Sequence, residues 1–201
     1  MDYHQIRIWR VSTSAKEIFD IVKAWAAISF AFAILESPSI FSNDFYRNLI
    51  IVSLTVGLGF LLHELGHKLV AQRYGCYAEF RSYDFGLLMA VLMSFAGFIF
   101  AAPGAVMIAG KVNRKKNGII AVAGPIVNII LALSFLSYGL VTNSLEMKFL
   151  SYGFSINAWL ALFNMIPFGF FDGKKIIDWN KGFYFLVLAA SIVLFLISFA
   201  F

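Results

Sequence analysis

The sequence predicts a membrane-embedded all-α bundle of five transmembrane helices, completed by a small membrane-associated β-sheet. Three observations support this fold class. Hydrophobic residues make up 61% of the 201 residues and charged residues only 13%, whereas soluble domains carry about 45–50% and about 25%. Apolar runs long enough to cross a bilayer recur along the chain. The stretches between them are short and unevenly charged, so we expect one polytopic domain over residues 1–201.

The first element expected is a β-strand over residues 3–11, because apolar and polar residues alternate there. Ser14 and Glu17 fit a capping box, the pattern in which two side chains close the first turn of a helix. A first transmembrane span at about residues 18–35 follows. No apolar run begins near Met1, so a signal peptide is not expected.

Four further spans are expected, because the remaining apolar runs of suitable length lie at about residues 48–71, 118–141, 149–167 and 183–201. The stretch after the first of these runs is polar. Within it, residues 77–83 could form a short strand.

The segment 85–110 decides the number of crossings. It is apolar, but Gly97, Pro103 and Gly104 interrupt it. As a full crossing it would give six transmembrane helices; as a re-entrant segment that dips in and returns, it leaves five. A re-entrant backbone must be buried in protein or line a wet cavity. The Ala-Ala-Pro-Gly-Ala run at 101–105 suits a turn or an extended segment of that kind.

The charge distribution favours five crossings. With a re-entrant segment, the N-terminus shares one side of the membrane with residues 72–117 and 168–182. That side then holds all of the 16 Lys and Arg residues except Arg47 and Lys148. Surplus basic residues collect in cytoplasmic loops, so this side is expected to be cytoplasmic. The same tendency accounts for the net charge of +5, and we expect a lipid bilayer and no nucleic acid as partner. The single cysteine, Cys76, excludes an intrachain disulfide.

A metal-binding pattern, H-E-L-G-H at residues 63–67, lies inside the second span. Residues four apart share a helix face, so His63 and His67 can bind one ion while Glu64 acts on a metal-bound water. Zinc is the usual ion of such a set and lowers the pKa of its water to roughly 7. Inserting a titratable side chain at membrane depth costs about 3 kcal/mol of free energy, so such residues are usually kept for a function. Three of them in one turn argue against an accidental match. If the helix enters the bilayer from outside at Asn48 and rises about 1.5 Å per residue, both histidines lie more than about 20 Å deep. In a hydrocarbon core of about 30 Å, this depth is the cytoplasmic third.

Two histidines leave a catalytic zinc site one protein ligand short. Asp172 is the stronger candidate, because it follows the apolar run 167–171 and emerges on the same side as His67 in the five-crossing topology. Asp84 is its competitor, and His4, in the N-terminal strand, is a weaker one. Asp-Gly is also a common turn, so an ordinary loop aspartate remains an alternative at this point.

These motifs resemble the site-2 protease family of intramembrane zinc metalloproteases, in its compact form without a PDZ or nucleotide-sensing domain. Besides the H-E-L-G-H helix, residues 164–173 (NMIPFGFFDG) are similar to the family's N-x-x-P-x-x-x-x-D-G. Residues 123–128 (AGPIVN) are similar to its G-P-x-x-N helix start. The resemblance spans about residues 55–175, and we expect the core of the domain at about 48–175.

The resemblance implies that His63, His67 and Asp172 bind one zinc ion per chain and that Glu64 is the catalytic base. It also implies that Asn164 lies close enough to bind the substrate backbone or the developing oxyanion as a second catalytic group. The alternative for Asn164 is a polar side chain that ties two helices together.

Asn128 carries the same two alternatives, substrate binding or helix packing. In the family, the re-entrant strand is thought to pair with the substrate. Here the corresponding stretch is 99–109, with Pro103, Gly104 and Ala105 in it. Its unpaired edge could hold an unwound substrate by backbone hydrogen bonds.

The function expected is hydrolysis of a peptide bond in or near the transmembrane helix of a single-span membrane protein. A catalytically inactive relative that acts as a scaffold would normally have lost one of the catalytic groups. A metal transporter would usually carry polar residues along several spans, whereas residues 118–141 and 183–201 hold almost none. The sequence indicates neither the substrate's identity and cleavage position nor the oligomeric state.

Overall fold

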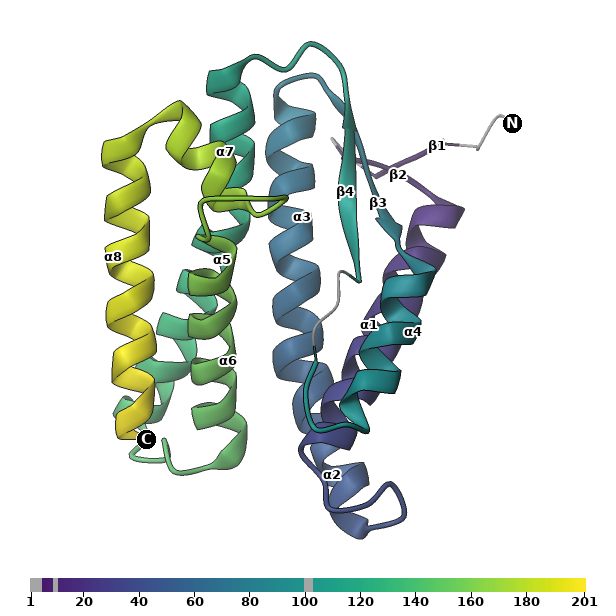
Figure 1. The fold of residues 1–201 in the computed structure, drawn as a ribbon, viewed down its shortest axis with the longest axis vertical. Helices are drawn as coiled ribbons and strands as arrows, with labels where there is room; N and C mark the ends of the chain where they lie inside the picture. The colour runs from purple at the N-terminus through teal and green to yellow at the C-terminus, as the bar shows by residue number, and fades with distance from the viewer. Residues whose placement is uncertain (1–4, 9–10, 100–102) are drawn as a thin grey trace.

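The computed structural model describes residues 5–8, 11–99 and 103–201. The described chain is mostly helical, with two short antiparallel sheets (Figure 1). In chain order the elements are β1 (Gln5–Ile8), β2 (Val11–Ser14), α1 (Ala15–Leu35), α2 (Asn43–Val52), the π-helix η1 (Ser53–Gly57), α3 (Leu58–Arg73), β3 (Tyr77–Ser82), α4 (Asp84–Ser94), β4 (Gly104–Ala109), α5 (Arg114–Val141), α6 (Lys148–Asn164), α7 (Asp172–Trp179), α8 (Lys181–Ile197) and the 3-10 turn η2 (Ser198–Ala200).

The N-terminal strand is part of a hairpin. β1 pairs antiparallel with β2, with Gln5 opposite Ser14. The prediction of one strand over residues 3–11 is therefore wrong in its extent, and residues 3–4 and 9–10 lie outside the described ones. Alternating polarity cannot show where a strand folds back, because both arms of a hairpin share the same two-residue period.

The N-terminal strand does not form a common sheet with the segment 85–110. β4, which comes from that segment, pairs with β3 instead. Side chains occupy the other edge of β3: Gln72 Nε2 donates to the Ala78 carbonyl (3.0 Å), and Glu17 Oε1 accepts from the Phe80 N–H (2.8 Å). A third strand would need these same backbone groups, so two separate two-stranded sheets form.

The first helix begins where the capping pattern predicted. Ser14 Oγ accepts a hydrogen bond from the Glu17 N–H (3.2 Å), which makes Ser14 the N-cap of α1. The Glu17 carboxylate turns inward, where it accepts from Thr13 Oγ1 (2.7 Å). α1 has 21 residues and is about 32 Å long, which matches the thickness of a bilayer core.

The second predicted span is one continuous helical segment, α2–η1–α3. It covers residues 43–73, 31 residues, and so begins earlier than the predicted range of 48–71. Its central turn, η1, is a π-helix, a rare turn that often occurs next to functional sites. Trp25 Nε1 on α1 donates to the Ser53 carbonyl at the start of this turn (3.0 Å).

The segment 85–110 runs along α1 as α4 and comes back to pair with β3 as β4 (Figure 1). α4 has 11 residues, about 16 Å, so it is too short to cross a bilayer core of about 30 Å. After a turn at Gly97 (φ +85°), the chain comes back as β4, which places Gly104 opposite Ser82. The segment does not form the single spanning helix that the six-crossing alternative requires.

The C-terminal half is a helical bundle made of α5, α6, α7 and α8. Four described helical segments are long and apolar enough to cross a membrane, at residues 15–35, 43–73, 114–141 and 181–200. α6 lies between α5 and α8 (Figure 1) and has 17 residues, about 26 Å. It falls just short of the usual length of a crossing, so the fifth crossing stays a prediction.

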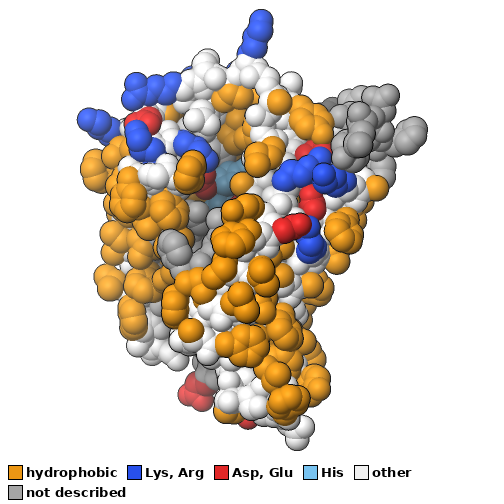
Figure 2. Space-filling model, turned by 45° about the vertical axis from the view of Figure 1, so that its right-hand side comes forward, with side chains coloured by type: hydrophobic (Ala, Val, Ile, Leu, Met, Phe, Trp, Pro, Cys, Tyr) orange, Lys and Arg blue, Asp and Glu red, His pale blue; other side chains and the backbone are white. Residues whose placement is uncertain are grey.

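Buried apolar clusters lie on both sides of the central helix α3. One joins α1 to the α2–η1 segment and the other joins α5, α7 and α8. Successive long helices alternate in direction, so the end of α3, the start of α5 and α7 lie at one end of the molecule (Figure 1). On the face seen in Figure 2, Lys and Arg side chains lie toward that end, and the surface below is mostly hydrophobic.

Candidate metal centre and active site

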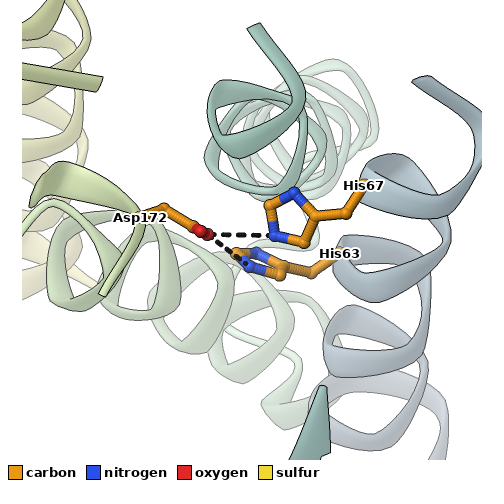
Figure 3. A group of neighbouring side chains, drawn as sticks. All are labelled: His63, His67 and Asp172. Atoms are coloured by element: carbon orange, nitrogen blue, oxygen red, sulfur yellow. Dashed lines mark ion pairs between the residues drawn. The ribbon is translucent and has the colours of Figure 1, made fainter. Parts of the chain in front are cut away.

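Three potential metal ligands meet at the centre of the molecule. His63 and His67 lie one turn apart on the inward face of α3, and Asp172 is the first residue of α7 (Figure 3). His63 Nε2 is 3.3 Å and His67 Nε2 is 3.0 Å from the same oxygen, Asp172 Oδ2. All three side chains are buried. The structure brings together the three residues expected from the sequence as ligands, and among the described residues they form the group that could hold a metal ion.

Both imidazoles are held from behind by an oxygen. His63 Nδ1 lies 2.6 Å from Asn128 Oδ1, and His67 Nδ1 lies 2.8 Å from the Ile120 carbonyl. Because a carbonyl oxygen only accepts, each Nδ1 carries the proton and donates it. With Nδ1 as the donor, a neutral imidazole presents its Nε2 lone pair toward Asp172, which is the tautomer that a metal ligand needs.

A chain of buried amides extends behind His63. Asn128 Nδ2 donates to the Gly59 carbonyl (3.2 Å) and to Asn157 Oδ1 (3.0 Å). Asn157 Nδ2 in turn donates to the Gly153 carbonyl of its own helix, α6 (2.9 Å). The oxygen and nitrogen of Asn128 are thus both engaged, which favours an orienting and helix-joining role over the substrate-binding role expected for it.

Asn157 is a site residue that the sequence analysis missed. It is fully buried in α6, and its one available signal was a polar side chain within an apolar span. Its oxygen lies so close to α3 that a Cβ at Gly59 would come within 2.5 Å of it. The α3–α6 contact therefore depends on Gly59 having no side chain.

Gly124 lets α5 approach the metal centre. A Cβ at this position would lie 2.4 Å from His63 Nε2 and 2.5 Å from His67 Nε2. The space that the ligand atoms face is therefore the space that an alanine side chain would fill. The predicted G-P-x-x-N helix start is instead inside α5, which runs unbroken through Pro125.

The segment between α6 and α7 brings Asp172 to the histidines. Gly173 packs so closely that a Cβ there would lie 2.3 Å from the Met165 carbonyl, which also accepts from the Tyr184 hydroxyl (3.0 Å). Asp172 Oδ1, the oxygen turned away from the histidines, accepts from Lys175 Nζ (3.1 Å).

Glu64 points to the edge of β4. Its Oε2 accepts a hydrogen bond from the Val106 N–H (3.0 Å). Val106 lies opposite Phe80, whose N–H donates away from the sheet to Glu17. The two residues therefore form a non-hydrogen-bonded pair, with their backbone groups directed outward. The unpaired edge of β4 accordingly faces α3 and Glu64.

The competing ligand candidates lie elsewhere. Asp84 pairs with Lys23 at the start of α4, and its side chain is 77% exposed. Its pKa is lowered, chiefly by the hydrogen bond from Lys23. His4 lies outside the described residues. Asn164, the last residue of α6, donates through Nδ2 to the Leu160 carbonyl of its own helix (2.9 Å).

A cavity of about 380 Å³ opens onto the candidate site. Its polar wall holds the two histidines, Glu64, Asp172 and Asn164, and its remaining wall is mainly apolar. Large side chains from both halves of the molecule contribute, among them Phe32, Phe60, Trp159 and Phe163. Pro103, Gly104 and Ala105 also line the cavity. A mostly apolar cavity with a few converging polar groups is the usual form of a substrate site.

The donor set fits a zinc ion. Two neutral imidazole nitrogens and one carboxylate oxygen are the usual three protein ligands of a catalytic zinc. Ligand bonds of about 2.0–2.1 Å at tetrahedral angles would separate the donor atoms by about 3.3 Å. The two nitrogen–oxygen distances, 3.0 and 3.3 Å, are close to this value without any movement of the backbone.

Comparison with known proteins identifies the class. The sequence profile of peptidase family M50 matches residues 51–145, which include both histidines and Glu64. The chain belongs to this family, the zinc metalloproteases of the site-2 protease type, and is a multi-pass membrane protein. It is also similar to a protein of Methanocaldococcus jannaschii that bears the name "Putative zinc metalloprotease". The two are 38% identical over 171 residues, which cover 83% of this chain and 86% of that protein. No solved structure matches the chain.

Proposed function

We propose that this protein hydrolyses a peptide bond in or near the transmembrane helix of a single-span membrane protein. The observation that carries the proposal is the position of the donor set and Glu64 on the wall of a mainly apolar cavity inside a membrane bundle. Such a cavity suits an apolar polypeptide. A soluble substrate would leave much of this lining in contact with water.

One zinc ion per chain would be held by His63, His67 and Asp172. When bound, it supplies a Lewis acid that polarises the carbonyl under attack and makes water acidic enough to react near neutral pH. The buried amides behind His63 keep the imidazole in the required tautomer. These donor types also agree with the chain's membership of a zinc metalloprotease family.

Glu64 acts as the base in this proposal. Its carboxylate takes a proton from the attacking water and passes it to the leaving amine. The hydrogen bond from Val106 orients one carboxylate oxygen and leaves the other without a partner among the described contacts. Asn164 lines the same cavity, from which its side chain can stabilise the oxyanion that develops on the substrate carbonyl.

The substrate binds in extended form along the free edge of β4. Residues two apart on a strand direct their backbone groups the same way, so Gly104 and Val106 both face outward. Ala105 lies between them and faces β3, and the Pro103 carbonyl accepts from the Tyr83 N–H (3.0 Å). Of the three residues in the stretch 99–109 that were expected to bind substrate, Gly104 thus offers backbone groups, while Pro103 and Ala105 shape the cavity.

The active site opens toward the cytoplasm in this proposal, and the segment 85–110 is re-entrant. Support comes from the basic end of the molecule, where α3 ends and α5 begins (Figure 2). Lys and Arg favour the cytoplasmic face. In this proposal α4 dips into the bilayer from that end and packs against α1, and β4 returns between β3 and α3.

Cleavage of a single-span substrate by the purified protein in detergent tests the function. We expect the natural chain to cleave and Glu64→Gln to retain zinc but lose activity by at least about 100-fold. His63→Ala should lose both zinc and activity, which separates a metal defect from a base defect. Equal cleavage by the natural chain and by Glu64→Gln would contradict the proposed mechanism. Substrate binding without cleavage by the zinc-loaded natural chain would favour a scaffold.

A further inference from the structure

The two oxygens of Asp172 have different partners. Oδ2 faces both histidines, while Oδ1 accepts from Lys175 Nζ at 3.1 Å. Lys175 lies three residues further along α7, so both side chains lie on the same helix face. The Asp172 side chain is 7% exposed and that of Lys175 is 42% exposed. The ammonium group therefore reaches from the cavity rim to a buried carboxylate oxygen.

The neighbouring lysine provides a contrast. Lys174 Nζ contacts both carboxylate oxygens of Asp178, at 2.7 and 2.6 Å, on the outer face of α7. This contact lowers the pKa of Asp178. Lys175 lines the cavity, whereas Lys174 is not among its lining residues. Two adjacent residues with the same chemistry thus differ in whether they touch the candidate site.

We propose that Lys175 is a positioning residue that keeps Asp172 a one-oxygen metal ligand and so leaves one metal position open for water. This inference rests on the proposed zinc site. A carboxylate can bind a metal through one oxygen or two. The hydrogen bond from Lys175 holds Oδ1 turned away from the histidines, so Oδ2 alone faces the metal position, and a catalytic zinc site needs its fourth position free.

Removing the Lys175 ammonium group would act on the metal in two ways, both of which strengthen its binding. The freed Oδ1 would be a buried oxygen without a partner, and a bound metal ion would be the nearest positive charge. A positive charge that opposes a divalent cation would also be gone. Asp172 itself would stay in place, because Gly173 packs against the Met165 carbonyl and Asp172 begins α7.

The test compares Lys175→Met with Lys174→Met as a matched control and with Lys175→Arg, which keeps the charge and the donor. Zinc affinity of the metal-free protein in detergent is measured by competition with a chelator. Lys175→Met should bind zinc more tightly, by on the order of tenfold, because a positive charge a few ångströms from the divalent ion is removed. Lys174→Met and Lys175→Arg should match the natural chain.

Cobalt(II) in place of zinc gives an independent readout, since the visible absorption of cobalt changes when one of its ligands is exchanged. Lys175→Met should differ from Lys174→Met in this absorption and should show a lower kcat with little change in KM. Weaker zinc binding in Lys175→Met, or values equal to those of Lys174→Met, would overturn the inference. Those results would leave the proposed function standing, which fails if Glu64→Gln cleaves as well as the natural chain or if the zinc-loaded natural chain does not cleave.

Discussion

At the scale of single residues, the site depends on oxygen atoms that never face the metal. The Ile120 carbonyl and the Asn128 amide oxygen each accept a hydrogen bond from one imidazole and so fix which nitrogen is free. In the opposite direction, Lys175 Nζ donates a hydrogen bond to Asp172 Oδ1, the oxygen turned away from the histidines. The ligand atoms are therefore aligned before any ion binds, and the loss of one such partner should appear as a change in metal affinity.

Asn128 and Asn164 should therefore give opposite results when each is changed to alanine. Asn128→Ala should lower zinc affinity by about 10–100-fold, because His63 loses the acceptor that fixes its tautomer. Asn164→Ala should keep its zinc and lower kcat by about 10²–10³-fold, as expected when an oxyanion donor is removed. Zinc competition and steady-state cleavage measure the two effects. Normal zinc affinity in Asn128→Ala would contradict the orienting role.

Gly124→Ala should abolish zinc binding while the protein still folds. The added Cβ would lie 2.4 Å from His63 Nε2, a separation that forces the imidazole out of position. Gly182→Ala is the control, because its nearest neighbour, Asn180 Oδ1, is 3.4 Å away. Metal analysis of the two purified variants, with unfolding followed by circular dichroism, checks the prediction. Full zinc occupancy in Gly124→Ala would show that the site relaxes more readily than its packing implies.

The sequence predicted His63, Glu64, His67 and Asp172 but missed Asn157. The first three share one helical turn, so their spacing alone brings them together. The apolar run before Asp172 and the five-crossing topology favoured Asp172 as the third ligand, and the resemblance to site-2 proteases strengthened that choice. Asn157 acts through helix packing, because it reaches His63 only across Asn128. Local periodicity carries no information on which two helices touch, so partners of this kind become visible only in the folded structure.

At the scale of elements, the β3–β4 sheet is held at both edges by glutamates. Glu17 on α1 accepts from the Phe80 N–H, and Glu64 on α3 accepts from the Val106 N–H. Lys68, one turn after Glu64, donates to Glu17 Oε2 (2.6 Å). These contacts form a closed loop through α1, α3 and both strands. The loop fixes the distance between the strand edge and the catalytic helix.

The buried pair within this loop should be essential for stability. Lys68→Met should lower the free energy of unfolding by about 3–5 kcal/mol, because it leaves the fully buried Glu17 carboxylate without its cation. Adding Glu17→Gln should restore most of this loss, since an amide oxygen can still accept from Phe80. Unfolding in mixed detergent micelles measures the difference, with the exposed Lys181→Met as control. A double variant as unstable as Lys68→Met would contradict the charge argument.

Helices were predictable from this sequence and strand pairing was not. A membrane helix satisfies its own backbone, so an apolar run of sufficient length predicts α1, α5 and α8 directly. The pairing of β3 with β4 joins residues 77–82 to residues 104–109, across an intervening helix. No local pattern indicates this pairing. Gln72 and Glu17 occupy the other edge of β3, so only one edge of that strand is left for β4, and neither residue is close to β4 in the sequence.

At the scale of the whole molecule, the direction of each helix alternates, and the positions of the loops follow from it. The end of α3, the start of α5 and α7 share one end, and the α5–α6 connection lies at the other (Figure 1). The charge argument anticipated this division from the positions of Lys and Arg alone. It could do so because Lys and Arg lie mainly in the connecting loops, and the side on which a loop lies does not depend on how the spans pack against one another.

Cysteine labelling from either side of the membrane should reveal this arrangement. Single cysteines at Lys16, Lys115 and Glu146, each exposed, mark the start of α1, the start of α5 and the α5–α6 connection. With Cys76, which is buried, replaced by serine, the first two should react with an impermeant reagent from the cytoplasm and the third only from outside. Labelling of Lys16→Cys and Lys115→Cys from opposite sides would instead support six crossings.

The π-turn η1 separates two requirements that the second span must meet. The number of apolar residues determines how well the segment fits the bilayer, whereas its rotation determines where His63 and His67 point. A π-turn holds about one residue more than an α-turn, so deleting one residue from Ser53–Gly57 would leave an ordinary α-turn with both imidazoles still directed at Asp172. One residue inserted between Gly57 and His63 would instead turn both imidazoles away by about 100°. The lengthened segment would still be an apolar helix of bilayer length, inserted and folded, but with its histidines out of phase.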